Sequence, residues 1–161
     1  KTGSIANFRI NDNIRALGIR CYGAGSPDGL IKHSEIPQLL KQALCMVHLK
    51  SSDAPGYALY EALAAACPII VARRLIWRNR MQDLFVPEET CLAFDKETHQ
   101  ALSEEDVTEC TREIAEALHR LRNPLENQRI GTNGSNRLRE LLWDERRDVE
   151  SLRQFMNKMF P

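Results

Sequence analysis

Short apolar runs and helical stretches alternate along the chain from residue 19 to residue 94, and this order restricts the fold more than any other feature. Four of the runs have the length of buried strands: residues 19–22, 45–49, 69–72 and 91–94. Helices are predicted in the intervals between them: residues 34–43, 57–66 and 75–85. Strands that alternate with helices form a parallel sheet with helices on both faces. We therefore predict a doubly wound parallel α/β sheet.

Capping signals mark the ends of several helices. Gly18 follows a short helical stretch, in the position where a left-handed backbone is favourable for glycine. Ser34 is the expected N-cap of the first helix between strands. Ser103 and Asp106 form an approximate capping box, which predicts the start of a long helix.

The last part of the chain is predicted to be helical. Asn123 is the expected cap of a helix that reaches about residue 142, with a proline in its first position. Gly131 and Gly134 are expected to weaken this helix. A further amphipathic helix is predicted over about 144–159. Packing of these helices on the rest of the protein is favoured, and contact with a membrane surface is the alternative.

The composition argues against several classes of protein. The length of 161 residues suits one domain, and 22 basic residues balance 22 acidic ones. A net charge of zero is unusual for a protein built to bind nucleic acid. The five cysteines contain no closely spaced pair and the four histidines share no metal-ligand spacing, so we predict neither a disulfide framework nor a metal site. We expect a cytoplasmic protein, with peripheral attachment to a membrane as an open alternative.

The segment from residue 50 to residue 68 carries the chemistry. A strand ends, a polar loop containing Gly56 follows, and a helix begins. The free N–H groups of Gly56, Tyr57 and Ala58 would favour an anion such as a diphosphate at the helix N-terminus. Asp53 lies in the loop and Glu61 lies one turn into the helix, so both carboxylates are expected to face one cleft. Two carboxylates in such a cleft suit the hydroxyl groups of a sugar and a ribose.

This segment resembles the E-x7-E signature of retaining glycosyltransferases that have two Rossmann-like domains, the GT-B fold, as in family 4 (glycosyl transferases group 1). That family usually has Glu-Gly-Phe-Gly, four residues, Glu-Ala, and then small residues leading to a proline and a strand. The matching residues here are Asp53-Ala54-Pro55-Gly56, Glu61-Ala62-Leu63-Ala64 and Pro68-Ile69-Ile70-Val71. A lone D-x7-E would carry no weight, and the alternative is that these alanines only pack a helix on a sheet.

The resemblance implies a function and roles for individual residues. It implies the C-terminal, donor-binding half of a GT-B enzyme that transfers a hexosyl group from a nucleotide-diphosphate sugar, with retention and without a metal or other cofactor. Glu61 would bind the ribose, Asp53 would meet the transferred sugar, and the amides after Gly56 would hold the donor. The acceptor would be a sugar, a lipid-linked sugar or a small molecule, and no nucleic acid partner is expected.

The chain departs from the family pattern in four respects. Asp53 replaces the first glutamate, and Pro55 replaces the aromatic residue before the glycine. An arginine-rich stretch, 73–80, replaces a glycine-rich one. The part of the chain before this segment is shorter than in the family, and the acceptor-binding domain is missing. Because the chain also begins with lysine, we expect a fragment of a longer protein that binds a donor weakly and does not turn it over.

Several arginines follow the strand that ends at residue 72. Arg73 and Arg74 are predicted donor-binding residues, because a guanidinium meets phosphate oxygens in a bidentate manner. Lys50, at the end of the preceding strand, would join them. Arg78 and Arg80 are weaker candidates. The alternatives are a solvated helix face or a contact with the missing domain.

The remaining aromatic and imidazole groups are assigned mainly to structure. Trp77 could stack on a base, but packing is favoured. His48 could act as an acid or base in the cleft, but a buried core histidine is favoured. His33, His99 and His119 are predicted to be surface residues.

Two other functions compete with glycosyl transfer. One is a non-catalytic interaction or regulatory module with the same Rossmann-like fold, which the substitution at Asp53 favours. The other is a different GT-B enzyme such as a sugar epimerase, which should lack the E-x7-E-like pattern. Affinity for a nucleotide-sugar distinguishes the first alternative from the transferase.

Overall fold

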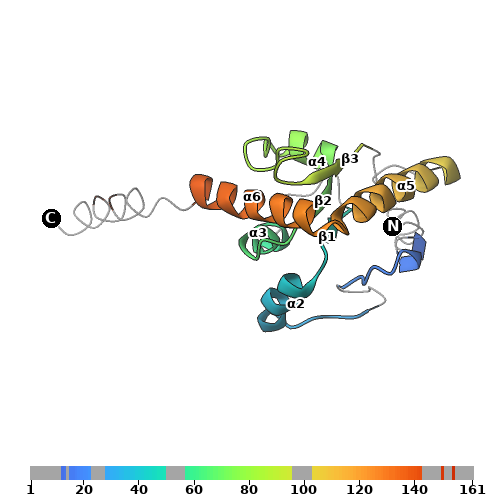
Figure 1. Cartoon of the computed structure of the whole chain (residues 1–161), viewed down its shortest axis with the longest axis horizontal. Coiled ribbons are helices and arrows are strands. Elements are labelled where there is room, and N and C mark those ends of the chain that lie inside the picture. The colour runs from blue at the N-terminus through green and yellow to red at the C-terminus, as the bar shows by residue number, and fades with distance from the viewer. Residues whose placement is uncertain are drawn as a thin grey trace.

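The computed structural model describes residues 12–13, 15–22, 28–49, 57–95, 103–142, 150 and 154. Figure 1 shows the arrangement of the elements within these ranges. In chain order they are η1 (His33–Glu35), α2 (Ile36–Gln42), β1 (Met46–His48), α3 (Tyr57–Ala64), β2 (Ile69–Ala72), α4 (Arg73–Arg78), β3 (Leu92–Phe94), α5 (Glu104–Leu121) and α6 (Pro124–Leu142).

A parallel sheet of three strands forms the centre of the described structure, in the order β1-β2-β3. Val47 is opposite Ile70, and Val71 is opposite Ala93. Every residue of β2 is buried, as expected for a central strand whose two faces are both covered. The sheet confirms the predicted α/β class and brings the carboxyl ends of the strands to one edge.

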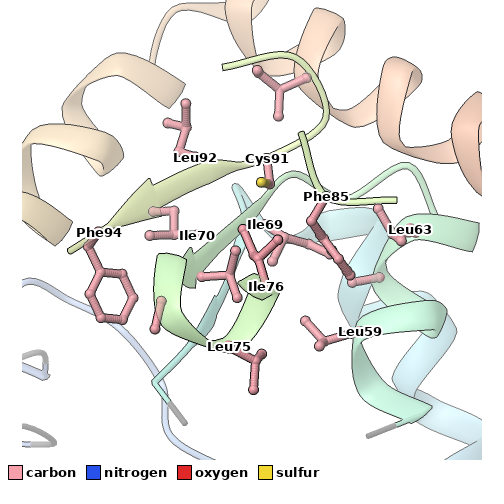
Figure 2. Packing of buried hydrophobic residues seen from close by; sticks show 14 of the residues in the cluster. Leu59, Leu63, Ile69, Ile70, Leu75, Ile76, Phe85, Cys91, Leu92 and Phe94 are labelled. Atoms are coloured by element: carbon pink, nitrogen blue, oxygen red, sulfur yellow. The ribbon is translucent and has the colours of Figure 1, made fainter. Parts of the chain in front are cut away.

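Helices flank this sheet and complete the core. The helix α3 contacts both β2 and α6, while α5 contacts β3 and α4 contacts β2. Figure 1 shows α4 above the sheet and α2 below it, with α6 alongside α3. Figure 2 shows how apolar side chains from these elements meet. The labelled residues of the cluster are Leu59, Leu63, Ile69, Ile70, Leu75, Ile76, Phe85, Cys91, Leu92 and Phe94.

The predicted strand at residues 19–22 is wrong, because this segment runs beside the sheet without joining it. A local turn uses the backbone of Cys21 instead. Its N–H donates to Oδ2 of Asp28 at 2.6 Å, and its carbonyl accepts from the N–H of Asp28 at 3.1 Å. A side chain that binds the backbone in this way competes with strand pairing.

Two predicted helix boundaries are also corrected. Ser34 is not an N-cap, because a 3-10 turn precedes α2 and Glu35 reaches back to the N–H of Lys32 at 3.2 Å. The helix predicted over 75–85 begins at Arg73 and ends at Arg78. It stops there because the side chain of Asn79 donates to the carbonyl of Leu75 at 3.0 Å and the chain then turns away.

The C-terminal capping predictions are confirmed. Ser103 and Asp106 form a reciprocal capping box at the start of α5. The side chain of Asn123 accepts from the N–H of Leu125 at 3.0 Å at the start of α6. The helix predicted over 144–159 falls largely outside the described residues. Within the described part of the chain, no helix is long and apolar enough to cross a membrane.

Gly131 and Gly134 lie within α6, which continues through both positions. Both glycines are buried. A β-carbon at Gly131 would lie 2.1 Å from the carbonyl oxygen of Ala66, just after α3. The two glycines therefore allow the backbone of α6 to approach the end of α3 closely.

Replacement of Ala66 by glycine should stabilise the protein, because the backbone of Ala66 is left-handed, with a φ of 52°. The N–H of Cys67 donates to the carbonyl of Ala62 and the N–H of Ala66 to that of Leu63, so α3 ends in a Schellman motif. Glycine adopts this conformation without steric cost. We expect Ala66→Gly to raise the free energy of unfolding by about 1 kcal/mol, measured by urea denaturation.

The matched control for this prediction is Ala64→Gly. Ala64 is an exposed residue of the same helix, two positions earlier, where the backbone is helical. Glycine there should lower the free energy of unfolding by about 1 kcal/mol. If Ala66→Gly and Ala64→Gly changed the free energy of unfolding in the same direction, the Schellman motif at the end of α3 would be incorrect.

Candidate functional site

A cleft of about 800 Å³ lies beside β1. One wall is the segment from Leu17 to Tyr22, and the other walls come from α2 and β1. The helix α3 contributes Ala58 and Glu61. Most of the lining is apolar, and a small number of charged or polar side chains face it, which is the usual character of a small-molecule site.

Glu61 is the carboxylate of this cleft in the described structure. It lies on the second turn of α3, with 26% of its side chain exposed. Nδ1 of His33 lies 3.4 Å from its Oε1. His33 is 84% exposed, so the surface prediction is confirmed, but the sequence analysis missed its contact with Glu61. No local pattern signals this contact, because the two residues belong to elements far apart in the sequence.

The N-terminus of α3 starts beside the cleft. Tyr57 is the first helical residue and is 87% exposed, while Ala58 lines the cleft. The first N–H groups of an α-helix have no acceptor within the helix and are available to a ligand. The predicted site residues Lys50, Asp53 and Gly56 lie outside the described residues.

Arg73 and Arg74 stand apart from this cleft. They are the first two residues of α4 and follow the carboxyl end of β2, as predicted. The guanidinium of Arg73 donates to the carboxylate of Asp95, which follows β3. Neither arginine belongs to the lining of the cleft that contains Glu61. The structure therefore brings Glu61, Ala58 and His33 together and leaves the two arginines on the rim of the sheet.

The other polar groups near the cleft include His48 and Cys45. His48, at the end of β1, lines the cleft and has a buried Nε2. Burial raises the pKa of the Cys45 thiol to about 12, with Cys67 as a smaller contribution. A thiol with this pKa is neutral at pH 7 and is not a nucleophile. Arg20 donates to the hydroxyl of Tyr22 at 3.4 Å, and this hydrogen bond raises the pKa of the guanidinium.

The remaining buried cysteines behave in the same manner. Burial raises the pKa of Cys91 to about 12 and that of Cys67 and Cys110 to about 11. All five cysteines are free thiols. Across the ranges that the structure describes, no cluster of histidine, cysteine or acidic side chains could hold a metal ion.

Comparison with protein families identifies the family of the chain. The model of a family described as glycosyl transferase-like matches residues 9–154. The chain belongs to this family. Membership of this family supports glycosyl transfer as the general activity. It also confirms the resemblance to glycosyltransferases that the sequence predicted. No curated protein and no solved structure matches the chain.

One aromatic residue of this glycosyl transferase-like chain is placed differently from the prediction. Trp77 on α4 is 63% exposed, so the predicted packing role is wrong. The buried positions of α4 are Leu75 and Ile76, and a helix of six residues has only one side against the sheet. Trp77 occupies the opposite side.

Proposed function

We propose that this chain binds a nucleotide-diphosphate sugar and serves the transfer of its hexosyl group to an acceptor, with retention of anomeric configuration. The observation that carries the proposal is Glu61, a partly buried carboxylate at the mouth of a cleft large enough for a nucleoside. It occupies the position of the second glutamate in the family signature. The acceptor is a sugar, a lipid-linked sugar or a small molecule.

Glu61 is assigned to the ribose. An ionised carboxylate has two oxygens and accepts hydrogen bonds from two neighbouring hydroxyl groups. His33, within 3.4 Å, limits the orientations of that carboxylate. The apolar walls of the cleft beside β1 would then take the flat face of the base.

The start of α3 is assigned to the diphosphate. The N–H groups of Tyr57 and Ala58, together with Gly56 and Lys50, would hold its oxygens and stabilise the charge that develops on the leaving group. Asp53 would contact the transferred sugar. No metal is proposed for this step, because fixed dipoles and cations supply the positive potential.

Arg73 and Arg74 have a conditional role in this proposal. Both lie at the carboxyl edge of the sheet, where ligands of open α/β sheets bind. Arg73 already pairs with Asp95, so it contacts a phosphate only by exchanging one anion for another. Arg74 is exposed at the same edge. We also propose that the protein works in the cytoplasm, where its five free thiols stay reduced.

A thermal-shift screen against nucleoside diphosphates and nucleotide-sugars tests the proposal. A ligand at ~100 times its dissociation constant stabilises the folded state by about 2.7 kcal/mol, a shift of roughly 5–10 °C for a domain of this size. We expect one nucleotide-sugar to give this shift. We expect Glu61→Ala to abolish it, since the ribose loses its acceptor.

The control is Glu105→Ala, which removes an exposed carboxylate on α5, away from the cleft. This variant should keep the full ligand shift. A shift that survives in Glu61→Ala would refute the assignment of the ribose. NMR of the product's anomeric proton, in a reaction with the identified donor, tests retention.

A non-catalytic module is the second candidate function. The helix α4 and the Arg73–Asp95 ion pair occupy the edge where the related enzymes have a glycine-rich stretch, and this observation favours it. The same screen separates the two candidates. A complete absence of stabilisation by any nucleotide would favour the module.

A further inference from the structure

The outer side of α4 combines cationic and aromatic side chains. Arg74, Trp77 and Arg78 are exposed on it, and Arg80 is exposed immediately after the helix. We call these four residues the α4 face. The helix contains no acidic residue. The α4 face is therefore a positively charged surface with one indole ring at its centre.

Arg80 is held in a backbone conformation that arginine does not favour. Its φ is 54°, in the left-handed region. The N–H of Met81 donates to the carbonyl of Ile76 at 2.9 Å, and the N–H of Arg80 to that of Trp77 at 3.3 Å. This is the hydrogen-bond pattern of a Schellman motif, whose left-handed residue is usually glycine. A cation thus stands here despite a conformational cost, and such a cost is often found at functional positions.

Apart from Arg74, whose conditional role in donor binding is given above, the α4 face is separate from the proposed donor site. No residue of the face lines the cleft that contains Glu61. Figure 1 shows α4 at the top of the view and α2, which forms a wall of that cleft, at the bottom. Trp77, Arg78 and Arg80 therefore have no part in the function proposed above.

We propose that the α4 face docks on the surface of an anionic lipid bilayer. An exposed indole prefers the boundary between water and hydrocarbon, because it has an apolar body and a polar N–H. Guanidinium groups next to it reach lipid phosphates and are attracted by the negative surface potential. The face thus pairs apolar insertion with charge attraction, as interfacial protein segments do.

A nucleic acid is a less suitable partner for the α4 face. Binding of nucleic acids depends on many phosphate contacts from a broadly basic surface. This chain has 22 basic and 22 acidic residues and no net charge, and the α4 face itself is a small area whose cations are Arg74, Arg78 and Arg80. A membrane contact of a few side chains fits this area better.

Vesicle binding tests the proposal on the full chain. Trp143→Phe leaves Trp77 as the only indole, because the chain has two tryptophans. With vesicles of phosphatidylcholine and phosphatidylglycerol, we expect Trp77 emission to move to shorter wavelength and the protein to sediment with the vesicles. Vesicles of phosphatidylcholine alone should do neither, and salt should weaken the binding to anionic vesicles.

Three variants locate the binding on the face. Arg78→Glu should lower vesicle partitioning by more than fivefold, since each cation near an anionic surface contributes about a fivefold factor. Arg80→Gly should lower it about fivefold while raising the melting temperature, because glycine relieves the left-handed strain. Loss of binding in a more stable protein cannot result from misfolding. Lys41→Glu, the same charge change on α2, should leave partitioning unchanged.

Several results would overturn the proposal. Equal binding to neutral and anionic vesicles is one, and equal loss in Arg78→Glu and Lys41→Glu is another. Response of Trp77 to RNA but not to vesicles at equal phosphate concentration would assign the face to a nucleic acid instead. Failure of the nucleotide screen would leave all of these outcomes unaffected.

Discussion

Gly131→Ala should lower the free energy of unfolding by about 3 kcal/mol, which corresponds to a fall of roughly 10 °C in melting temperature. The added β-carbon would lie 2.1 Å from the carbonyl oxygen of Ala66 and 3.3 Å from Cδ of Pro68. These are backbone and ring atoms next to β2, so they have little room to move. The helix α6 would have to separate from α3. Alanine's greater helix propensity offsets only about 1 kcal/mol of this cost.

Gly134→Ala is the matched control, because it brings the same gain in helix propensity. Its β-carbon would meet Cδ2 of Leu63 at 2.8 Å and the carbonyl oxygen of Thr90 at 3.1 Å. The end of a leucine side chain yields more easily than a backbone carbonyl. Urea denaturation should therefore show a smaller loss than for Gly131→Ala. If Gly131→Ala were as stable as the parent chain, the close packing of α6 on α3 would be incorrect.

This packing connects the C-terminal part of the chain with the candidate site. The helix α3 carries Glu61, and the close contact holds its C-terminal end through Ala66. Further hydrogen bonds hold the segment before β3 to α6. The side chain of Arg129 donates to the carbonyl of Glu88 at 2.9 Å, and that of Arg137 to the carbonyl of Asp83 at 2.7 Å. In this way α6 holds α3, the helix that carries Glu61, in place.

The sequence predicted the elements whose signals are local. β2 was found at its observed bounds, because an apolar run after a proline is distinctive. The capping box of α5 and the cap of α6 were also found, since each depends on residues only a few positions apart. Glu61 was placed correctly on α3 by the family signature and the helix start.

Prediction from the sequence was wrong or incomplete where a contact with a residue distant in the sequence determines the local structure. The segment 19–22 is apolar enough for a strand, but Asp28 binds its backbone. The packing role of Gly131 was missed, because its contact with Ala66 is invisible in the sequence. The same reason hid the pairing of Arg73 with Asp95, which lie 22 positions apart. Trp77 was assigned to the core because composition does not reveal which side of a short helix faces the sheet.

Phe85→Ala should lower the free energy of unfolding by 3–5 kcal/mol, on the order of 10 °C in melting temperature. Phe85 comes from the connection between α4 and β3, yet only 1% of it is exposed. Figure 2 shows its ring among side chains from α3, β2 and α4, including Leu63 and Ile76. Removal of the ring leaves a cavity between α3, β2 and α4, and these elements cannot move together to fill it.

Trp77→Ala is the comparison for Phe85→Ala, because it truncates an aromatic side chain of the neighbouring helix. Its 63% exposure predicts a change within about 0.5 kcal/mol. If Phe85→Ala does not fold, Phe85→Leu takes its place in the test. Its free energy of unfolding should fall by less than about 1.5 kcal/mol. Equal losses for Phe85→Ala and Trp77→Ala would mean that the indole packs in the core. That outcome would remove both the cavity argument and the exposed α4 face, since each depends on which of the two aromatic side chains water reaches.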